Sequence, residues 1–484
     1  MARHRWLEGA DIWEHAAVVR SFSESPFHPP HPELGSEIPH TFFSPYLLLL
    51  GLAARLTGLT PFGVLAWAGV ANLILVLVGL RLFVRLFSSE RYAPLFALVF
   101  TVALWGPDVW HYSGFLHLGV FWQVLPYPAT FTKGLTLLGV VAFASFVRTR
   151  RPVYLGLVLG IGVVVLLSHP IDIVFLYVLL GAYALGGSPR SRLAVLLTVA
   201  CLGAITLLIA MAWPFFPFRR LLLGEAAYRS LVAADERPLY TDVAVRLAPT
   251  LLAVPLIVLR LWRRRLDPLG IGFGILVAAW LIGGVTEQYF LGRMVVFWTL
   301  LLHVALAAAV AGIHPSAHTG RRRVAAVAFV AAFVVAAVAG AYEHRLGLAP
   351  AVPDPLAGRV LGPGIDRGTA IRYWESLLTA VGREDVVLSP VETGWQVPAF
   401  TGRTVASLHP LAFVPDHDRR REDVAAFFDP AAGTPLRREI IDRYCVSFLL
   451  FPTTSPAAPD LGRLGTVRHI DPRHTLVELE GHRR

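Results

Sequence analysis

Two carboxylates and an imidazole occur within five residues near the start of the chain, in the segment Asp11-Ile12-Trp13-Glu14-His15. A carboxylate can accept a proton from an attacking group, and an imidazole can hydrogen-bond a substrate, so this segment could carry acid–base chemistry. In a helix, Glu14 would lie one turn after Asp11 on the same face. We therefore predict that Asp11 and Glu14 are catalytic and that His15 contacts substrate. The alternative is that the two acids only cap and solvate a surface helix.

Histidines recur through this region, and imidazole is a frequent metal ligand. They are His15, His28, His31 and His40. Their spacing matches no compact ligand pattern, and prolines separate them. The sequence therefore predicts no metal-binding residues and names no cofactor, with a divalent metal kept as the less favoured alternative.

Further candidate residues border apolar segments later in the chain. Lys133 follows a Pro126-Tyr127-Pro128 bend, where its ammonium could meet an anionic group as a point charge. Snorkelling of the side chain to the membrane surface is the alternative. Arg293 ends the polar connection Thr286–Arg293, which also contains Glu287, and directly precedes an apolar segment. We predict that Lys133, Glu287 and Arg293 bind substrate.

His169 and Asp172 lie in a short turn, Ser168-His169-Pro170-Ile171-Asp172, between two apolar segments. Ionisable groups at membrane depth are costly and often functional, whereas a turn at the surface avoids that cost. We include both residues among the predicted substrate-binding residues.

The composition is that of a membrane protein. Of 484 residues, 55% are hydrophobic and only 16% are charged, and the mean hydropathy is +0.59, which excludes an ordinary soluble globular protein. The net charge of +10 rests almost wholly on arginine, since Lys133 is the only lysine. These arginines cluster between apolar segments, as signals of membrane orientation do, and they do not indicate a nucleic-acid partner.

Ten stretches are long or apolar enough to be read as membrane-spanning helices. They are Pro61–Leu82, Tyr92–Trp105, Ala129–Phe146, Val153–Leu167, Ile171–Leu185, Leu193–Trp213, Val243–Leu261, Pro268–Val285, Met294–Ile313 and Val324–Ala341. The run Tyr46–Leu56 is too short to span and favours a helix lying on the membrane surface.

Arginines occur in alternate connections between these stretches, which the positive-inside rule places in the cytoplasm. They are Arg81, Arg85 and Arg91; Arg148, Arg150 and Arg151; Arg190 and Arg192; Arg260, Arg263, Arg264 and Arg265; and Arg321, Arg322 and Arg323. The acidic segment at the start and the whole tail after Tyr342 are therefore predicted to face the extracytoplasmic side of the cell membrane.

The tail is predicted to form a small α/β domain, because helical patterns alternate there with short β-branched runs and Pro/Gly punctuation. Expected helices are Thr369–Val381, Arg420–Phe428 and Pro435–Tyr444, and expected strands are Val386–Ser389, Thr404–Leu408, Val446–Phe451, Thr466–Ile470 and Thr475–Glu480. This order favours a partly parallel sheet.

Several of these features together resemble the GT-C glycosyltransferases, which are integral membrane enzymes. The resemblance rests on the acidic segment in the first outer loop, the Pro-rich loop ending in Ser44-Pro45-Tyr46, the helical bundle, and tail motifs such as Phe400-Thr401-Gly402-Arg403. It implies an all-α polytopic bundle of about ten transmembrane helices with a small extracytoplasmic α/β domain. The segments would be a first loop, 1–60; a transmembrane domain, 61–346; and a soluble domain, 347–484. The family's first transmembrane helix is absent here, and the basic N-terminus would have to be exported without it, so we expect a helix to precede Met1. The alternative is a short N-terminus that crosses the membrane unaided.

The resemblance also implies a reaction. A sugar would pass from a polyprenyl-phosphate donor to a glycan, lipid or protein acceptor, with inversion, while Asp11 acts as the base and Arg293 and Lys133 face the donor phosphate. The rival is a non-enzymatic transporter or flippase of lipid-linked intermediates, which should show broken helices or repeats.

Overall fold

The computed structural model describes residues 11–187, 191–223, 236–313, 320–348, 370–408 and 413–480, together with 352, 356 and 359. The chain divides into two compact units: a first unit of residues 1–66, 214–228 and 366–484, and a second unit of residues 67–213 and 229–365. The predicted first loop, 1–60, and residues 366–484 of the predicted tail domain fall in the first unit, and most of the predicted bundle falls in the second.

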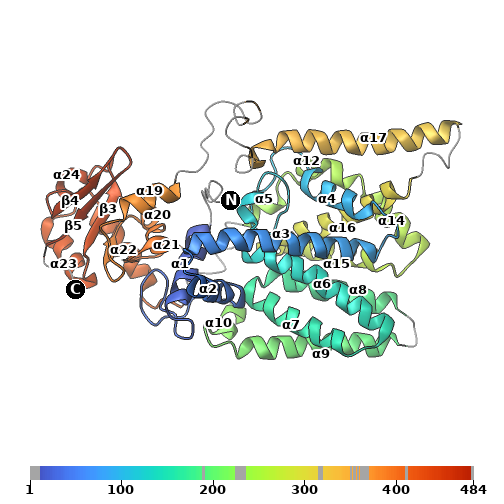
Figure 1. Ribbon diagram of the computed structural model, residues 1–484, viewed down its shortest axis with the longest axis horizontal. Helices are drawn as coiled ribbons and strands as arrows, with labels where there is room; N and C mark the ends of the chain where they lie inside the picture. Colours follow the sequence, from blue (N-terminus) through green and yellow to red (C-terminus); the bar gives the residue numbers. More distant parts are fainter. Residues whose placement is uncertain are drawn as a thin grey trace. The chain divides into compact units, whose positions relative to one another are not determined.

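The second unit is helical (Figure 1). Within the described residues, six helical stretches are long and apolar enough to cross a membrane: α3 (Pro61–Arg85), α6 (Pro128–Thr149), α9 (Arg192–Met211), α15 (Pro268–Val285), η2 with α16 (Tyr289–Arg293 and Met294–Ala311) and α17 (Gly320–Glu343). Shorter apolar helices are α4 (Ala93–Ala103), α7 (Val153–Ser168) and α8 (Ile171–Gly186). The chain is thus a multi-pass membrane protein, as predicted.

One predicted span is wrong. The stretch Val243–Leu261 forms three short helices instead of one: α12 (Val243–Arg246), α13 (Ala248–Leu251) and α14 (Val254–Arg263). A proline lies in the first turn of both α13 and α14. Proline has no backbone N–H and fits the start of a helix but not its interior, so the apolar run is broken twice.

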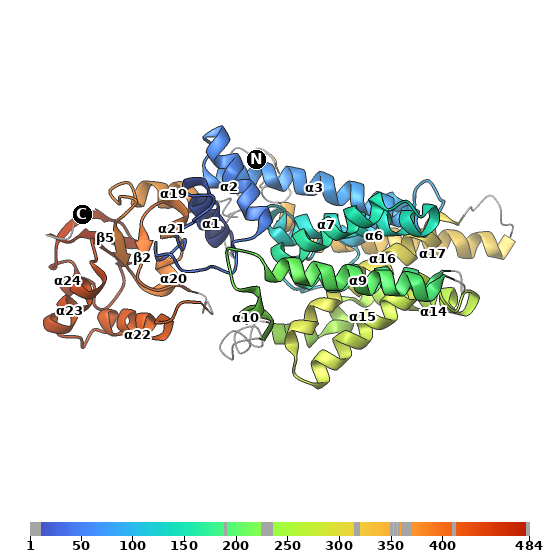
Figure 2. The same cartoon turned by 90° about the horizontal axis from the view of Figure 1, so that it is seen from below.

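The helices of the bundle pack against one another in pairs. Helix α6 packs on both α7 and α8 (Figure 1), and α7 packs on α9. Figure 2 shows α6, α7 and α9 of this group from below. In the core, the Phe175 ring of α8 stacks on the Phe297 ring of α16 at 4.8 Å. The remaining short elements are α5 (Phe121–Val124), η1 (Arg237–Tyr240) and η4 (Arg345–Leu348).

In the first unit, helix α1 (Ile12–Glu24) is buried on most of its faces. It packs on α2 (Pro45–Thr57) and on α21 (Val397–Phe400) of the tail. The predicted surface run Tyr46–Leu56 is confirmed as a helix by α2, whose Ser44 hydroxyl accepts the Leu47 N–H at 3.3 Å and so caps it. Because α1 is buried, the alternative that its acids merely decorate a solvated helix is wrong.

The tail forms a five-stranded sheet in the order β2-β1-β3-β5-β4. The strands are β1 (Val386–Leu388), β2 (Arg403–Thr404), β3 (Phe448–Pro452), β4 (Thr466–Ile470) and β5 (His474–Glu478). Strands β2, β1 and β3 are parallel, and β5 is antiparallel to both β3 and β4, so the partly parallel sheet is confirmed. The helices of the tail are α19 (Ala370–Leu377), α20 (Val391–Gly394), α21, α22 (His417–Phe428), α23 (Thr434–Tyr444) and α24 (Ala458–Leu461).

Strand β2 is shorter than the predicted Thr404–Leu408. The Thr404 N–H donates to the Glu33 carbonyl at 2.7 Å, and the Arg20 guanidinium donates to the Gly402 carbonyl at 3.0 Å. The first loop therefore supplies backbone and side-chain partners at this edge of the sheet, and joins the N-terminal segment to the tail within one unit.

The short α10 (Phe218–Leu223) also belongs to the first unit.

Candidate functional site

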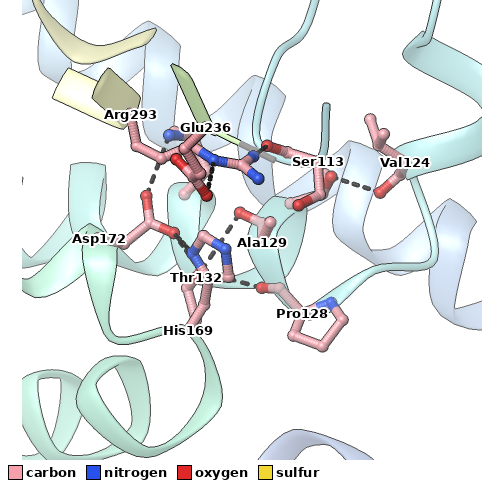
Figure 3. Close-up of polar contacts among 11 residues, drawn as sticks. Ser113, Val124, Pro128, Ala129, Thr132, His169, Asp172, Glu236 and Arg293 are labelled. Atoms are coloured by element: carbon pink, nitrogen blue, oxygen red, sulfur yellow. Dashed lines mark hydrogen bonds and ion pairs between the residues drawn. The ribbon is translucent and has the colours of Figure 1, made fainter. Parts of the chain in front are cut away.

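A buried carboxylate organises one cluster of candidate residues in the second unit. Asp172 accepts the Thr132 hydroxyl at 2.7 Å and lies 2.6 Å from His169 Nδ1, both through Oδ2 (Figure 3). Its Oδ1 forms an ion pair with Lys133 Nζ at 3.0 Å. The side chains of Asp172 and Lys133 are 0% and 2% exposed. These contacts join the second turn of α6, where Thr132 and Lys133 are adjacent, to the first turn of α8.

The Lys133 side chain does not snorkel to the surface. Its ammonium lies 3.9 Å from the centre of the Phe297 ring, a favourable cation–π contact. A buried charge is tolerated only when it is paired, and Asp172 supplies the partner. Lys133 and Asp172 were both predicted from the sequence to bind substrate, and in the structure they contact each other.

Arg293 lies at the end of η2 and is held by three groups of the same unit. Its Nε forms an ion pair with Glu236 Oε1 at 2.7 Å, and Nη1 donates to the Ser113 carbonyl at 2.9 Å. The guanidinium also lies 4.6 Å from the Tyr112 ring centre. Among the described residues Nη2 has no hydrogen-bond partner, and a guanidinium carries five N–H donors, so donor capacity remains for a ligand.

Arg293 and Lys133 approach the same short segment of chain: Arg293 donates to the Ser113 carbonyl, and a Cβ atom added to the next residue, Gly114, would lie 4.0 Å from Lys133 Nζ. The second unit therefore contains two cations in one neighbourhood, each held by a carboxylate. Such a pair suits an anionic group such as a phosphate. Glu287, in contrast, is exposed in a left-handed backbone conformation, with φ of 57°.

Replacing Asp172 with asparagine is expected to destabilise the folded protein by roughly 3–5 kcal/mol, because the Lys133 ammonium would remain buried without a counter-charge. The double variant Asp172→Asn/Lys133→Met should recover most of this loss, since the buried charge is then gone. Thermal unfolding in detergent, followed by tryptophan fluorescence, measures both. A double variant as unstable as the single one would contradict the ion-pair account.

A second cluster, in the first unit, surrounds Glu14. His40 Nε2 lies 3.3 Å from Glu14 Oε1, and both side chains are at most 1% exposed. The His31 and His40 rings meet edge to face at 4.9 Å. His31 Nδ1 accepts the N–H groups of Glu33 and Leu34 at 3.3 and 3.2 Å. Glu14 therefore contacts one member of a histidine pair in the first loop.

The other two residues of the acidic segment have different surroundings. Asp11 is half-buried at the N-terminus of α1, and its side chain makes no capping hydrogen bond. The His15 ring is buried and lies 5.2 Å from the Phe42 ring. The capping alternative therefore does not explain the Asp11 carboxylate, which is the more accessible of the two acids.

Replacing His31 with asparagine should make stability less sensitive to mild acid. Burial, and then the neighbouring His40, hold the pKa of His31 well below its ordinary value. As the pH falls below about 6.5, the unfolded chain gains a proton at this position that the folded chain does not, so stability is lost. Asparagine can accept the same backbone N–H groups without titrating.

Melting temperatures at about pH 7 and about pH 5 test this expectation. The decrease on acidification should be smaller in His31→Asn than in the wild type, and equal decreases would show that His31 does not titrate on unfolding.

Among the described residues, no group of three or more His, Cys, Asp or Glu side chains is arranged to hold a metal.

The sequence missed Glu236 and Tyr112 as partners of Arg293. Both lie in polar connections where no periodicity or motif distinguishes them.

Comparisons with known proteins give a structural likeness only. No protein-family model and no curated protein sequence matches the chain. The apo structure of ArnT from Cupriavidus metallidurans is similar over 98% of this chain and 94% of that one, with a TM-score of 0.57 and 14% identity. The same protein bound to undecaprenyl phosphate gives a TM-score of 0.54, also at 14% identity and with the same coverage.

The archaeal oligosaccharyltransferase AglB from Archaeoglobus fulgidus, in complex with an inhibitory peptide and a dolichol-phosphate, is also similar. It covers 92% of this chain, with a TM-score of 0.50 and 13% identity, and the chain spans 66% of its length. At these identities the likeness establishes a shared fold.

Proposed function

We propose that this chain, which has the GT-C fold of membrane glycosyltransferases, is itself a glycosyltransferase. It takes one sugar from a polyprenyl-phosphate donor and transfers it to a glycan, lipid or protein acceptor on the extracytoplasmic side of the cell membrane. The observation that carries this proposal is the cluster of Lys133, Asp172, His169 and Arg293 in the membrane-spanning unit.

The cations of this cluster suit a lipid-linked phosphate. Arg293 keeps Nη2 available among the described residues, while Glu236 and Ser113 fix the orientation of its guanidinium. A preorganised donor of this kind stabilises negative charge without reorganising during the reaction. Lys133 adds positive charge nearby, and Asp172, with His169, holds its ammonium in place. Fold likeness to proteins whose structures contain undecaprenyl phosphate and dolichol-phosphate supports the same choice of donor.

The chemistry is an inverting displacement. A hydroxyl or amide group of the acceptor attacks the anomeric carbon of the donor sugar, and its proton passes to the Asp11 carboxylate. The bond from the anomeric carbon to the phosphate oxygen breaks, and its electrons leave with the polyprenyl phosphate. Arg293 stabilises the charge on that leaving group.

The other candidates have supporting roles. Glu14, buried beside His40, positions the segment that carries Asp11, and His15 contacts substrate from the same helix. Glu287 lies exposed in the connection before Arg293 and contacts the acceptor. The tail domain lies outside the cytoplasm, since it follows the last of the spans that the arginine-rich connections orient.

One observation favours the rival function. The stretch from Val243 to Arg263 is broken into three helices, and transporters often bind substrate at broken helices. In the transport account lipid-linked intermediates would cross the membrane with their sugar–phosphate bond intact. The two functions therefore differ in whether that bond is cleaved.

A test uses purified protein in lipid nanodiscs with a panel of polyprenyl-phosphate sugars, mannose and arabinose first, and a membrane extract as the source of acceptors. Transfer predicts equal amounts of glycosylated acceptor and free polyprenyl phosphate. Movement of intact donor between the leaflets of vesicles, with no bond cleavage for any donor, would replace the proposal with the transport account.

A further inference from the structure

Three histidines of the second unit gather around the loop between α4 and α5, and none of them is among the residues assigned above. The His117 and His344 rings lie 5.8 Å apart, and the His111 ring lies 6.1 Å from His117 and perpendicular to it. His117 is 0% exposed and His344 is 8% exposed, whereas His111 is exposed to solvent. His344 directly follows α17, so the group links two distant parts of the chain.

Backbone carbonyls fix the tautomer of both buried rings. His117 Nε2 lies 2.8 Å from the Trp110 carbonyl, and His344 Nε2 lies 3.0 Å from the Gly106 carbonyl. A carbonyl oxygen only accepts hydrogen bonds, so each Nε2 must carry the ring proton. Each Nδ1 therefore presents a lone pair. His117 is fully buried, and a buried charge without a partner is costly, so the neutral form of this imidazole is favoured.

The two Nδ1 atoms converge beside Gly119. A Cβ atom added to Gly119 would lie 3.2 Å from His117 Nδ1 and 3.7 Å from His344 Nδ1. Among the described residues, neither nitrogen has a hydrogen-bond donor, and that of His117 is fully buried. Two lone pairs that approach one small space without a donor need a cation or a water molecule between them.

We propose that His117 and His344 bind one divalent transition-metal ion such as Zn²⁺ through their Nδ1 atoms. Neutral imidazole is a preferred ligand of such ions. The carbonyls that receive each Nε2–H orient the rings in the way that outer partners of metal-bound histidines do. Zinc bonds to imidazole nitrogen at roughly 2.0–2.1 Å. An ion bound to both rings would therefore lie partly in the space that a side chain at Gly119 would fill.

Two histidines leave coordination positions to be filled. Water would take them, because no third protein ligand is arranged there among the described residues. The ion would join the outer loop to the segment after α17. That segment is already close, because Gly347 of η4 lies so near the Leu118 carbonyl that an added Cβ would stand 1.8 Å from it.

The test measures zinc bound to the purified full-length chain after chelator treatment and dialysis against Zn²⁺, by mass spectrometry of the metal and by competition with a zinc indicator. We expect His117→Asn and His344→Asn each to weaken one zinc site by at least about tenfold. Gly119→Ala keeps every histidine but fills the space, and it should weaken the same site.

His303→Asn is the matched control. His303 is also fully buried in this unit, its Nε2 lies 3.0 Å from the Thr250 hydroxyl, and its Nδ1 has no partner among the described residues. It lacks a second imidazole nitrogen beside it, so His303→Asn should bind zinc as the wild type does. Zinc binding that is unchanged in His117→Asn, His344→Asn and Gly119→Ala, or no bound zinc in the wild type, would overturn the proposal and leave a water molecule between the rings.

The metal readout does not depend on sugar transfer, so this inference and the proposed function fail separately. Addition of Zn²⁺ should also raise the melting temperature of the wild type and of His303→Asn, because a ligand that binds only the folded state stabilises it. The same addition should leave the melting temperature of His117→Asn unchanged.

Discussion

Asp11→Asn is expected to reduce sugar transfer by roughly 100-fold or more, because asparagine cannot accept the proton that leaves the attacking group. The fold should persist, since the Asp11 side chain is half-buried and makes no capping hydrogen bond to α1. Donor affinity should be nearly unchanged, because the proposed base does not contact the phosphate. Product formation and donor binding, measured separately, check both statements.

Glu14→Gln is the comparison for this experiment. Glu14 is buried beside His40, so its loss should lower the melting temperature while folded protein retains more activity than Asp11→Asn does. If instead Asp11→Asn turns over as the wild type and folded Glu14→Gln is inactive, the base is Glu14.

Arg293→Gln is expected to weaken donor binding and also to slow transfer, together by about 100-fold in kcat/KM. The guanidinium meets phosphate charge in the bound donor, and it meets more charge in the transition state. Glutamine retains a hydrogen-bond donor but carries no charge. Binding of a fluorescent polyprenyl phosphate and steady-state kinetics give the two contributions.

Arg246→Gln is the matched control for Arg293. Arg246 belongs to the same unit, pairs with Asp108 at 2.9 Å and lies 5.2 Å from the Trp110 ring centre. Its side chain is 14% exposed, against 17% for Arg293. Donor binding that falls equally in both variants would show a general effect of positive charge in these polar connections, not a phosphate contact at Arg293.

The fold could be predicted from the sequence where apolar length decides it. An apolar run such as Pro268–Val285 is expected to cross the membrane as a helix, because a helix satisfies every backbone hydrogen-bonding group within the segment. The stretch after Val243 is similarly apolar but contains two prolines. It was predicted as one helix because of its apolar content, and the prolines were given too little weight. Strand β2 is shorter than predicted, and its Thr404 N–H pairs with the Glu33 carbonyl of the first loop, a contact that no local pattern encodes.

The candidate site could be predicted only in part. Asp172 and Lys133 stand out because charge is rare in apolar segments, but their contact depends on how α6 packs on α8. Glu236 lies 57 positions from Arg293 in a connection rich in charged residues, so nothing local distinguishes it. The burial of α1 also follows from packing against the tail, which lies hundreds of residues away.

Sugar transfer is tested most directly by measuring the polyprenyl phosphate that the purified chain in nanodiscs releases from a panel of polyprenyl-phosphate sugars, with acceptor extract present. The account predicts that at least one donor yields free polyprenyl phosphate and an equal amount of glycosylated acceptor. It also predicts that Asp11→Asn, folded and able to bind donor, yields roughly 100-fold less. Release that is equal in the wild type and in Asp11→Asn, or intact donor in every reaction, would contradict it.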